Sequence, residues 1–219
     1  MPPYRDVAEF NDRAVSYDHG WRGRLHHEIA DRTGNLALAT VVASPRRVLD
    51  LGCGTGYLVR ALAGHYPDAE QLVGIDAAPE MVRTASATTH DDRLTFAVGV
   101  AEQIGHPDET FDLIVSTTSF DHWSDQQAGL IECARVLRPG GQLVARRPVL
   151  LVADADNAHQ PPRQSPHQAA RHPSAAGCQV LLPAMAPVVC SDHQRGDRDE
   201  AGLRSARTFI ALERAEAAV

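Results

Sequence analysis

The chain has 219 residues, of which 43% are hydrophobic and 22% are charged, a balance typical of a folded domain with a core. Its net charge of −7 excludes a general attraction to nucleic acid or to anionic membranes. No apolar run approaches the roughly 18 residues that cross a bilayer, and the N-terminus lacks the apolar stretch of a signal peptide. The four cysteines form no Cys-x-x-Cys pair, so we expect a cytoplasmic protein with reduced thiols.

Residues 1–44 are polar, with apolar side chains at helical spacing between residues 7 and 43. Gly20, Gly23 and Gly34 interrupt this pattern, so it predicts one or two helices rather than a single regular one. Helices that precede the first strand of an α/β sheet often cover one rim of it. We therefore expect residues 1–44 to form an N-terminal helical cap.

From residue 45 onward, short apolar runs alternate with amphipathic stretches. Strands are predicted at residues 48–51, 72–75, 94–98, 111–116 and 142–145. Helices are predicted at residues 55–65, from Pro79 onward, and from a capping box at Ser124 and Gln127 until Pro139-Gly140-Gly141 stops it. This alternation predicts an α/β fold over residues 45–152: a doubly wound, Rossmann-like, mostly parallel sheet with helices on both faces.

A glycine-rich loop, Gly52-Cys53-Gly54-Thr55-Gly56, follows the first predicted strand and opens a helix. Glycines in this position let the backbone approach a ligand bound beyond the carboxyl ends of the strands. A dinucleotide fingerprint would have its third glycine where Tyr57 stands, which disfavours a nicotinamide-dependent oxidoreductase without excluding it. Asp76 ends the second predicted strand, where a carboxylate can accept hydrogen bonds from both hydroxyls of a ribose.

These segments carry a family resemblance. Residues 48–56 resemble motif I of the class I S-adenosylmethionine-dependent methyltransferases, and Gly74-Ile75-Asp76 with Met81 resembles their acidic second motif. Residues 111–116 resemble the fourth strand of that family, and residues 136–141 resemble the turn before its fifth strand. The most similar subset is the small-molecule methyltransferases of type 11. The resemblance implies methyl transfer from S-adenosylmethionine to a small-molecule acceptor by in-line displacement.

The resemblance also implies where the cofactor binds. Asp50, Gly52 and Gly54 would surround its methionine part, while Asp76 would hold the ribose. The full predicted cofactor-binding set is Asp50, Gly52, Cys53, Gly54, Gly56, Asp76, Ala77, Met81, Val100, Ala101 and Ser116. The family usually has an acidic residue where this chain has Val100; either the backbone of Val100 and Ala101 suffices there, or Glu102 substitutes.

The predicted acceptor side follows the fourth strand. His122 is the candidate general base, with Asp121 or a backbone carbonyl to orient it; alternatively, His122 packs over the cofactor. The candidate substrate or lid residues are Tyr17, Trp21, Phe120 and Trp123, although Tyr17 could equally be a core residue. No metal is expected, because the adjacent His26 and His27 point to different faces of a helix and lack a second ligand pair.

Residues 153–219 form an irregular tail. Residues 153–179 lack large apolar side chains, so disorder is expected there. Residues 149–152 could extend the fifth strand, residues 180–182 or 188–189 are candidates for a sixth strand, and residues 208–212 for a seventh. The tail's Arg, Ala, Pro and His content also fits a shifted reading frame in GC-rich DNA, and an inactive cofactor-binding protein therefore stays open. The sequence indicates neither the methyl acceptor nor the oligomeric state.

Overall fold

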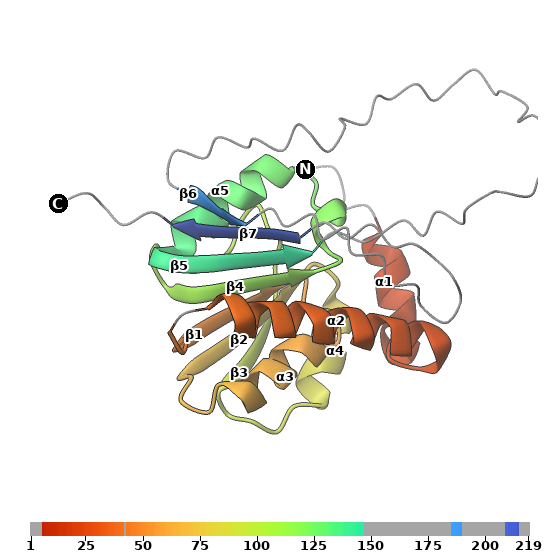
Figure 1. The fold of residues 1–219 in the computed structure, drawn as a ribbon. Coiled ribbons are helices and arrows are strands. Elements are labelled where there is room, and N and C mark those ends of the chain that lie inside the picture. The colour runs from red at the N-terminus through yellow and green to blue at the C-terminus, as the bar shows by residue number, and fades with distance from the viewer. Residues whose placement is uncertain (1–5, 42, 147–184, 190–208, 215–219) are drawn as a thin grey trace, which may run out of the picture.

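A computed structural model describes residues 6–41, 43–146, 185–189 and 209–214 (Figure 1). The helices are α1 (Val7–Arg13), the 3₁₀ turn η1 (Ala14–Ser16), α2 (Gly20–Thr40), α3 (Tyr57–His65), α4 (Pro79–Ala87), the 3₁₀ turn η2 (Phe120–His122) and α5 (Gln126–Val136). The strands are β1 (Arg47–Leu51), β2 (Gln71–Asp76), β3 (Leu94–Val98), β4 (Phe111–Thr117), β5 (Leu137–Arg146), β6 (Met185–Val189) and β7 (Phe209–Arg214).

The described strands form one sheet in the order β3-β2-β1-β4-β5-β7-β6. Strands β3, β2, β1, β4 and β5 are parallel, whereas β7 is antiparallel to both β5 and β6. Strand order reverses between β1 and β4, so the loops that follow these strands diverge and leave a crevice at their carboxyl ends. The predicted α/β class and the five predicted parallel strands are confirmed.

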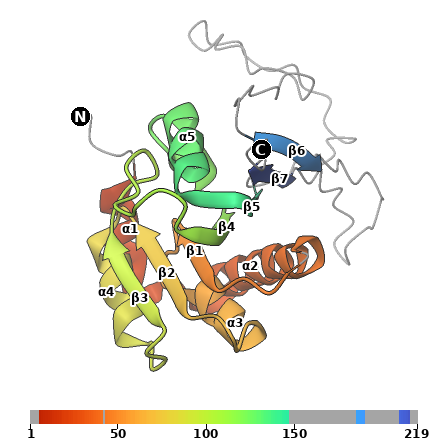
Figure 2. The ribbon, with the colours of Figure 1, turned by 90° about the vertical axis from the view of Figure 1, so that its left-hand side faces the viewer.

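Two apolar cores lie on opposite faces of this sheet, because successive side chains of a strand point to opposite sides. Leu49 packs on one face with Leu130 of α5. Val48 packs on the other face with Ala37 of α2 and Leu62 of α3. Figure 2 shows α5 on one side of the strands and α2 with α3 on the other. Helices therefore cover both faces, as predicted.

The glycines of the cap do not interrupt α2 as expected. Gly20 begins the helix, while Gly23 and Gly34 lie inside it. A Cβ at Gly23 would overlap the backbone of Asp18, and a Cβ at Gly34 would lie 3.3 Å from Leu58 Cδ1. Both glycines thus permit close packing, which outweighs their low helix propensity.

The boundaries of α5 also differ from the prediction. Asp125, rather than Ser124, is the N-cap, and its side chain accepts the backbone N–H of Ala128 at 3.0 Å. The helix ends at Val136, before Pro139-Gly140-Gly141, because Leu137 adopts an extended conformation and pairs with Phe111 of β4. The Pro-Gly-Gly segment therefore lies within β5, at an irregularity in its pairing with β4.

Two strands from the tail complete the described sheet. Strand β7 confirms the strand expected at residues 208–212, and β6 contains the candidate pair 188–189. Since β7 pairs with β5, β5 is not an edge strand. The disorder expected at residues 153–179 and the strands considered at 149–152 and 180–182 lie outside the described residues.

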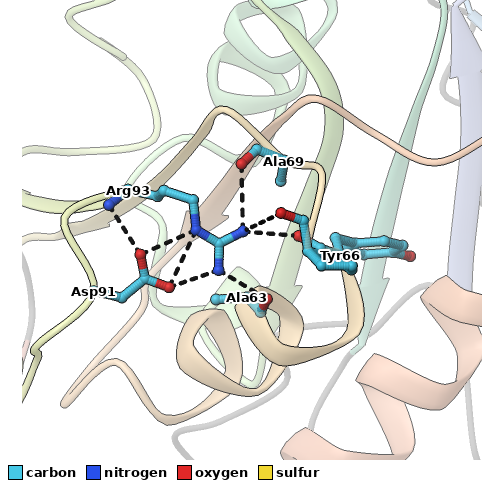
Figure 3. A network of polar contacts seen from close by, with 6 residues as sticks. Ala63, Tyr66, Ala69, Asp91 and Arg93 are labelled. Carbon is cyan, nitrogen blue, oxygen red and sulfur yellow. Dashed lines mark hydrogen bonds and ion pairs between the residues drawn. The ribbon is translucent and has the colours of Figure 1, made fainter.

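Arg93 fixes the start of β3 against the end of α3 (Figure 3). Its guanidinium donates to the backbone carbonyls of Ala63 at 3.1 Å and Tyr66 at 3.0 Å, and pairs with Asp91 at 2.6 Å. These carbonyls lie where a helix end leaves acceptors without partners of its own. The contacts hold the edge of the sheet remote from β5.

Candidate active site

A cavity of about 990 Å³, including its open mouth, lies at the carboxyl ends of the parallel strands. One wall comes from the cap, the floor from the glycine loop after β1, and the remaining walls from the segments that follow β2, β3 and β4. The cavity therefore occupies the switch point that the strand order defines.

The three glycines of the loop all have positive φ, at 78°, 54° and 80° for Gly52, Gly54 and Gly56. Their surroundings differ. A Cβ at Gly52 would overlap Ser119, and one at Gly56 would lie 2.8 Å from the ring of Phe96, so both serve packing. A Cβ at Gly54 would find only Tyr17 Cε1 at 4.0 Å. Gly54 is thus the position where the loop leaves open space for a ligand.

Asp76 joins the end of β2 to the glycine loop. Its Oδ2 accepts the backbone N–H of Gly54 at 2.8 Å, and its Oδ1 accepts that of Ala78 at 2.8 Å. Burial raises the pKa of this carboxyl, and the two backbone hydrogen bonds and the charge of His122 oppose that rise. Each carboxylate oxygen can accept more than one hydrogen bond, so Asp76 can still bind hydroxyl groups in the cavity.

Asp50 lies at the base of the cavity and is only 2% exposed. Burial, reinforced by the charge of Asp76, raises its pKa to about 7, and a hydrogen bond from the backbone of Val59 opposes this rise. Within the described structure its Oδ2 has no hydrogen-bond partner. A buried carboxylate oxygen without a partner is costly, and a cationic group in the cavity would satisfy it.

The cap is fastened to the glycine loop by polar contacts. Asp18 Oδ1 accepts from the hydroxyl of Thr55 at 3.0 Å and lies 2.9 Å from His27 Nε2. The hydroxyl of Tyr57 donates to Asp31 at 3.0 Å, and its ring stacks on His27 with centroids 3.8 Å apart. These contacts place the cap over the cavity as a fourth wall.

Tyr17 belongs to the cap, and its side chain lines the cavity as well as packing against an apolar cluster. Its ring stacks on His26 with centroids 4.4 Å apart, and burial raises its pKa to about 12, opposed by Arg13. Burial and then Arg13 lower the pKa of His26. The phenol of Tyr17 is therefore neutral at physiological pH.

Most of the predicted site residues line this one cavity. They are Tyr17, Asp50, Gly52, Cys53, Gly54, Asp76, Ala77, Met81, Val100, Ala101, His122 and Trp123. The structure thus gathers side chains and backbone from the cap and from the segments after four different strands.

Four predicted residues do not line the cavity. Gly56 packs against Phe96, as described above, and Trp21 is 65% exposed on the outside of the cap. Ser116 is buried, with its hydroxyl 2.8 Å from that of Ser119. Phe120 belongs to the apolar core beside Trp123.

The segment after β3 reaches the cavity through Val100 and Ala101. Glu102, the alternative considered for the missing acidic residue, does not line the cavity, and its Oε1 accepts the backbone N–H of Asp125 at 2.7 Å. Of the two alternatives, Val100 and Ala101 are therefore the residues that line the cavity, and Glu102 is not.

Several cavity residues were not predicted as site residues. Val7 and Phe10 reach it from α1, Tyr57 from the start of α3, and Thr117 and Ser119 from the end of β4. Tyr57 and Thr117 could have been found, since Tyr57 directly follows the glycine loop and Thr117 directly follows the fourth predicted strand. Val7 and Phe10 show only helical spacing, which does not say what the helix covers.

Within the described residues, no group of three or more His, Cys, Asp or Glu side chains is placed to hold a metal ion. Of the helices described, none is both long and apolar enough to span a membrane. The described cysteines, Cys53 and Cys133, are free and buried, and burial raises the pKa of both thiols. Cys53 is therefore protonated in the loop.

Comparison with known proteins shows which proteins the chain resembles. The profile of a family described as "Methyltransferase domain" matches residues 49–145. The chain is 41% identical over 149 residues to a malonyl-[acyl-carrier protein] O-methyltransferase of Methylococcus capsulatus, covering 64% of this chain and 53% of that protein. It is 35% identical over 133 residues to a demethylmenaquinone methyltransferase of Deinococcus radiodurans, covering 60% of this chain and 50% of that protein. The chain thus spans about half the length of these curated relatives.

Solved structures agree with this comparison. The methyltransferase in a complex with the Trm112 activator of Haloferax volcanii is 33% identical and superposes with a TM-score of 0.57, covering 64% of this chain and 60% of that one. The YcgJ protein of Bacillus subtilis is 18% identical with a TM-score of 0.60, covering 85% of this chain and all of that one, and it supports the fold alone. The matched region, residues 49–145, is thus similar to methyltransferases, and families of this type use S-adenosylmethionine as the methyl donor.

Proposed function

We propose that the protein transfers the methyl group of S-adenosylmethionine to a small-molecule acceptor. The observation that supports this most is that Asp50, Gly54 and Asp76 line one cavity at the carboxyl ends of the strands. The unpartnered carboxylate oxygen of Asp50 and the open face of Gly54 suit the methionine part of that cofactor, and the carboxylate of Asp76 suits its ribose.

Each of these residues has a distinct role in the proposal. Asp50, through its unpartnered Oδ2, would bind the cofactor's ammonium group. Gly54 would let the methionine part lie against the backbone, and Asp76 would accept the ribose hydroxyls. The apolar side chain of Met81, fully buried beside the cavity, would contact the adenine.

Bound in this way, the cofactor supplies an electrophilic methyl group on a sulfonium. The protein's own contribution is to align the two reactants and to exclude water. The cap provides that exclusion, because Asp18 and Asp31 fasten it to the loop that would hold the cofactor.

Ligand-induced thermal stabilisation tests the cofactor. At a hundredfold excess over Kd, a bound ligand adds about 2.7 kcal/mol to the free energy of unfolding. We expect S-adenosylmethionine and S-adenosylhomocysteine to stabilise the protein and NADH to leave it unchanged. Stabilisation by NADH alone would instead assign a nicotinamide cofactor.

Mass spectrometry of ligand copurified with the protein gives an independent readout of the cofactor. Binding of S-adenosylmethionine with no transfer to any acceptor in a broad metabolite extract would favour an inactive cofactor-binding protein. A methylated product, identified with an isotopically labelled methyl group, would support the proposal and name the acceptor.

A further inference from the structure

We propose that Asp6 and His122 form a proton-accepting pair at the cavity edge, which deprotonates a hydroxyl group of an uncharged acceptor. His122 is the catalytic residue of the pair, and Asp6 is a positioning residue. The inference rests on the proposed methyl transfer and adds to it the base, its partner and the class of acceptor.

The contact joins two residues that are far apart in the sequence. His122 Nδ1 lies 3.0 Å from Asp6 Oδ2. An ionised carboxylate can only accept hydrogen bonds, so in the neutral imidazole Nδ1 carries the proton and Nε2 keeps a lone pair. Among the described residues none forms a hydrogen bond to Nε2, and His122 lines the cavity. The free nitrogen is therefore the one that can take a proton.

Phe10 provides a second constraint on the imidazole. Its ring meets that of His122 edge to face, with centroids 5.2 Å apart and an angle of 88° between the planes. Asp6 and Phe10 both come from the cap, while His122 follows β4. Contacts from the cap thus set the orientation of the base.

The geometry of Asp6 indicates that its side chain bonds to the distant His122 instead of capping its own helix, α1. Asp6 occupies the N-cap position of α1, where an aspartate usually accepts a hydrogen bond from its own helix. Here its side chain makes no such bond. Its φ of 76° also lies in the left-handed region, which side chains other than glycine rarely adopt.

The base lies near the cofactor end of the cavity. His122 is close enough to Asp76 for its charge to oppose the rise in the pKa of that carboxyl. The charged groups that face the imidazole are therefore Asp6 from the cap and Asp76 from β2, with Asp121 beside it in η2. An acceptor held between His122 and the ribose site would place its nucleophilic oxygen beside the methyl donor.

The lining of the cavity favours an uncharged acceptor. Among the described lining residues, the acidic side chains are Asp18, Asp50 and Asp76, and no arginine is present. A carboxylate acceptor would meet like charge with no lysine or arginine among the described lining residues to offset it, and it would need no base. A neutral hydroxyl must lose its proton, and Val7 and Phe10 offer apolar contact to the rest of such a molecule.

The chemistry balances without another reactant. The acceptor oxygen forms a bond to the methyl carbon as the sulfur–methyl bond breaks, and the hydroxyl proton passes to Nε2. The products are a methyl ether and S-adenosylhomocysteine, and the imidazolium then releases its proton to solvent. Positioned bases of this kind contribute roughly 10²–10⁴-fold to rates.

The tautomer of His122 tests the pair without any acceptor. Imidazole ¹⁵N chemical shifts of the labelled full chain distinguish Nδ1–H from Nε2–H, and His122→Gln assigns the signals. We expect Nδ1–H in the wild type and a shift toward Nε2–H in Asp6→Ala. Asp12→Ala, which removes an exposed carboxylate from the same helix, should leave the tautomer unchanged. An Nε2–H tautomer in the wild type would overturn the proposal.

Methyl transfer tests the catalytic role. A panel of neutral phenols and enols is compared with matched carboxylic acids, using labelled S-adenosylmethionine. We expect transfer to a hydroxyl, with kcat reduced roughly 10²–10⁴-fold in His122→Gln and the acceptor KM changed far less. Asp6→Ala should lose part of that rate and Asp6→Glu should regain it, while Asp12→Ala matches the wild type.

Two failures are distinguishable in this experiment. If calorimetry shows that the wild type does not bind S-adenosylmethionine, the proposed function itself is wrong. If the cofactor binds but only carboxylates are methylated, no hydroxyl is methylated, or hydroxyl transfer survives His122→Gln, the inference about the pair is wrong.

Discussion

The backbone N–H of Gly54 donates to Asp76 Oδ2 at 2.8 Å, so the loop after β1 and the carboxylate that ends β2 hold each other in place. Backbone hydrogen bonds from Gly52 and Cys53 to the carbonyl of Ile75, at 2.7 and 3.0 Å, join the same two segments. The loop conformation is therefore fixed before a ligand arrives, which reduces the entropic cost of binding.

Gly54→Val should abolish binding of S-adenosylmethionine. The added side chain would enter open cavity space, and the left-handed φ of 54° would destabilise the fold by about 1–2 kcal/mol. Calorimetric titration, with thermal unfolding to confirm folding, measures both effects. In Gly64→Ala, an added Cβ on α3 has no atom within 4 Å, so affinity should be retained. Unchanged affinity in folded Gly54→Val would refute the assignment of the site.

Asp76→Ala should weaken cofactor binding by roughly 1.5–3 kcal/mol, about 10- to 150-fold, because charge-assisted hydrogen bonds to the ribose are lost. The structure adds a second effect, since Gly54 and Ala78 would lose the acceptors of their backbone N–H groups. We therefore expect a loss of about 1–3 kcal/mol in the free energy of unfolding. Asp76→Asn, which retains one acceptor oxygen, should lose less cofactor affinity and less free energy of unfolding. An affinity loss below twofold in Asp76→Ala would show that Asp76 does not bind the ribose.

The buried carboxyl of Asp50 should make stability depend on pH. Its pKa is raised from 3.8 to about 7 by burial and by Asp76, so the folded state holds a proton that the unfolded chain has released. Stability from this group is full below about pH 4 and is lost as the pH rises toward 7. Relative to wild type, Asp50→Asn should gain about 2–3 kcal/mol between pH 5 and pH 8.

Urea unfolding of wild type and Asp50→Asn at pH 5 and at pH 8 measures this difference in the free energy of unfolding. Asp92→Asn removes an exposed carboxylate and serves as the control, for which we expect no comparable change. Asp50→Asn should also lose cofactor affinity, because the amide cannot pair with an ammonium group as a carboxylate does. Parallel pH profiles of Asp50→Asn and wild type would contradict the raised pKa.

Asp18→Ala should loosen the cap. It removes the acceptor for Thr55 and the partner of His27, contacts worth roughly 1–3 kcal/mol together. The effect should be mainly a faster dissociation of S-adenosylmethionine, about 5- to 150-fold, because closure is what retains it. Stopped-flow displacement measures this rate. A double-mutant cycle with Thr55→Val should reveal coupling, and strict additivity would show that the two side chains do not act together.

The local pattern of apolar residues and glycines was enough to predict the central sheet and the edge of that sheet that faces the ligand. The run at residues 72–75 is apolar on both faces, as buried parallel strands require, and so is the run at residues 48–51 apart from Asp50. The glycines between strand and helix marked the cavity floor. The position of the cap was harder to predict from the sequence. It depends on contacts such as that between Asp18 and Thr55, which are separated by 37 residues. Trp21 illustrates the limit: although it is near Tyr17 in the sequence, its side chain is 65% exposed and does not line the cavity.

The part of the cavity expected to hold the methyl acceptor shows the same limit of prediction from the sequence. His122 could be predicted because it follows a strand that ends at the ligand edge. Its partner could not, since Asp6 is 116 residues away and occupies a position that local rules assign to helix capping. Short-range rules therefore locate the base but not the residue that orients it.

Truncation after Arg146 should cause association. It removes β7, whose antiparallel pairing covers residues 142–146 of β5, together with β6. An uncovered edge of this kind offers unpaired backbone groups to another chain. Sedimentation velocity should show larger species than for the full chain, whereas a truncation after Arg214, which keeps β7, should match the full chain. Cofactor affinity should persist, because β1 and β2 lie across β4 from the new edge. A truncated chain that sediments like the full one would show that β7 does not protect β5.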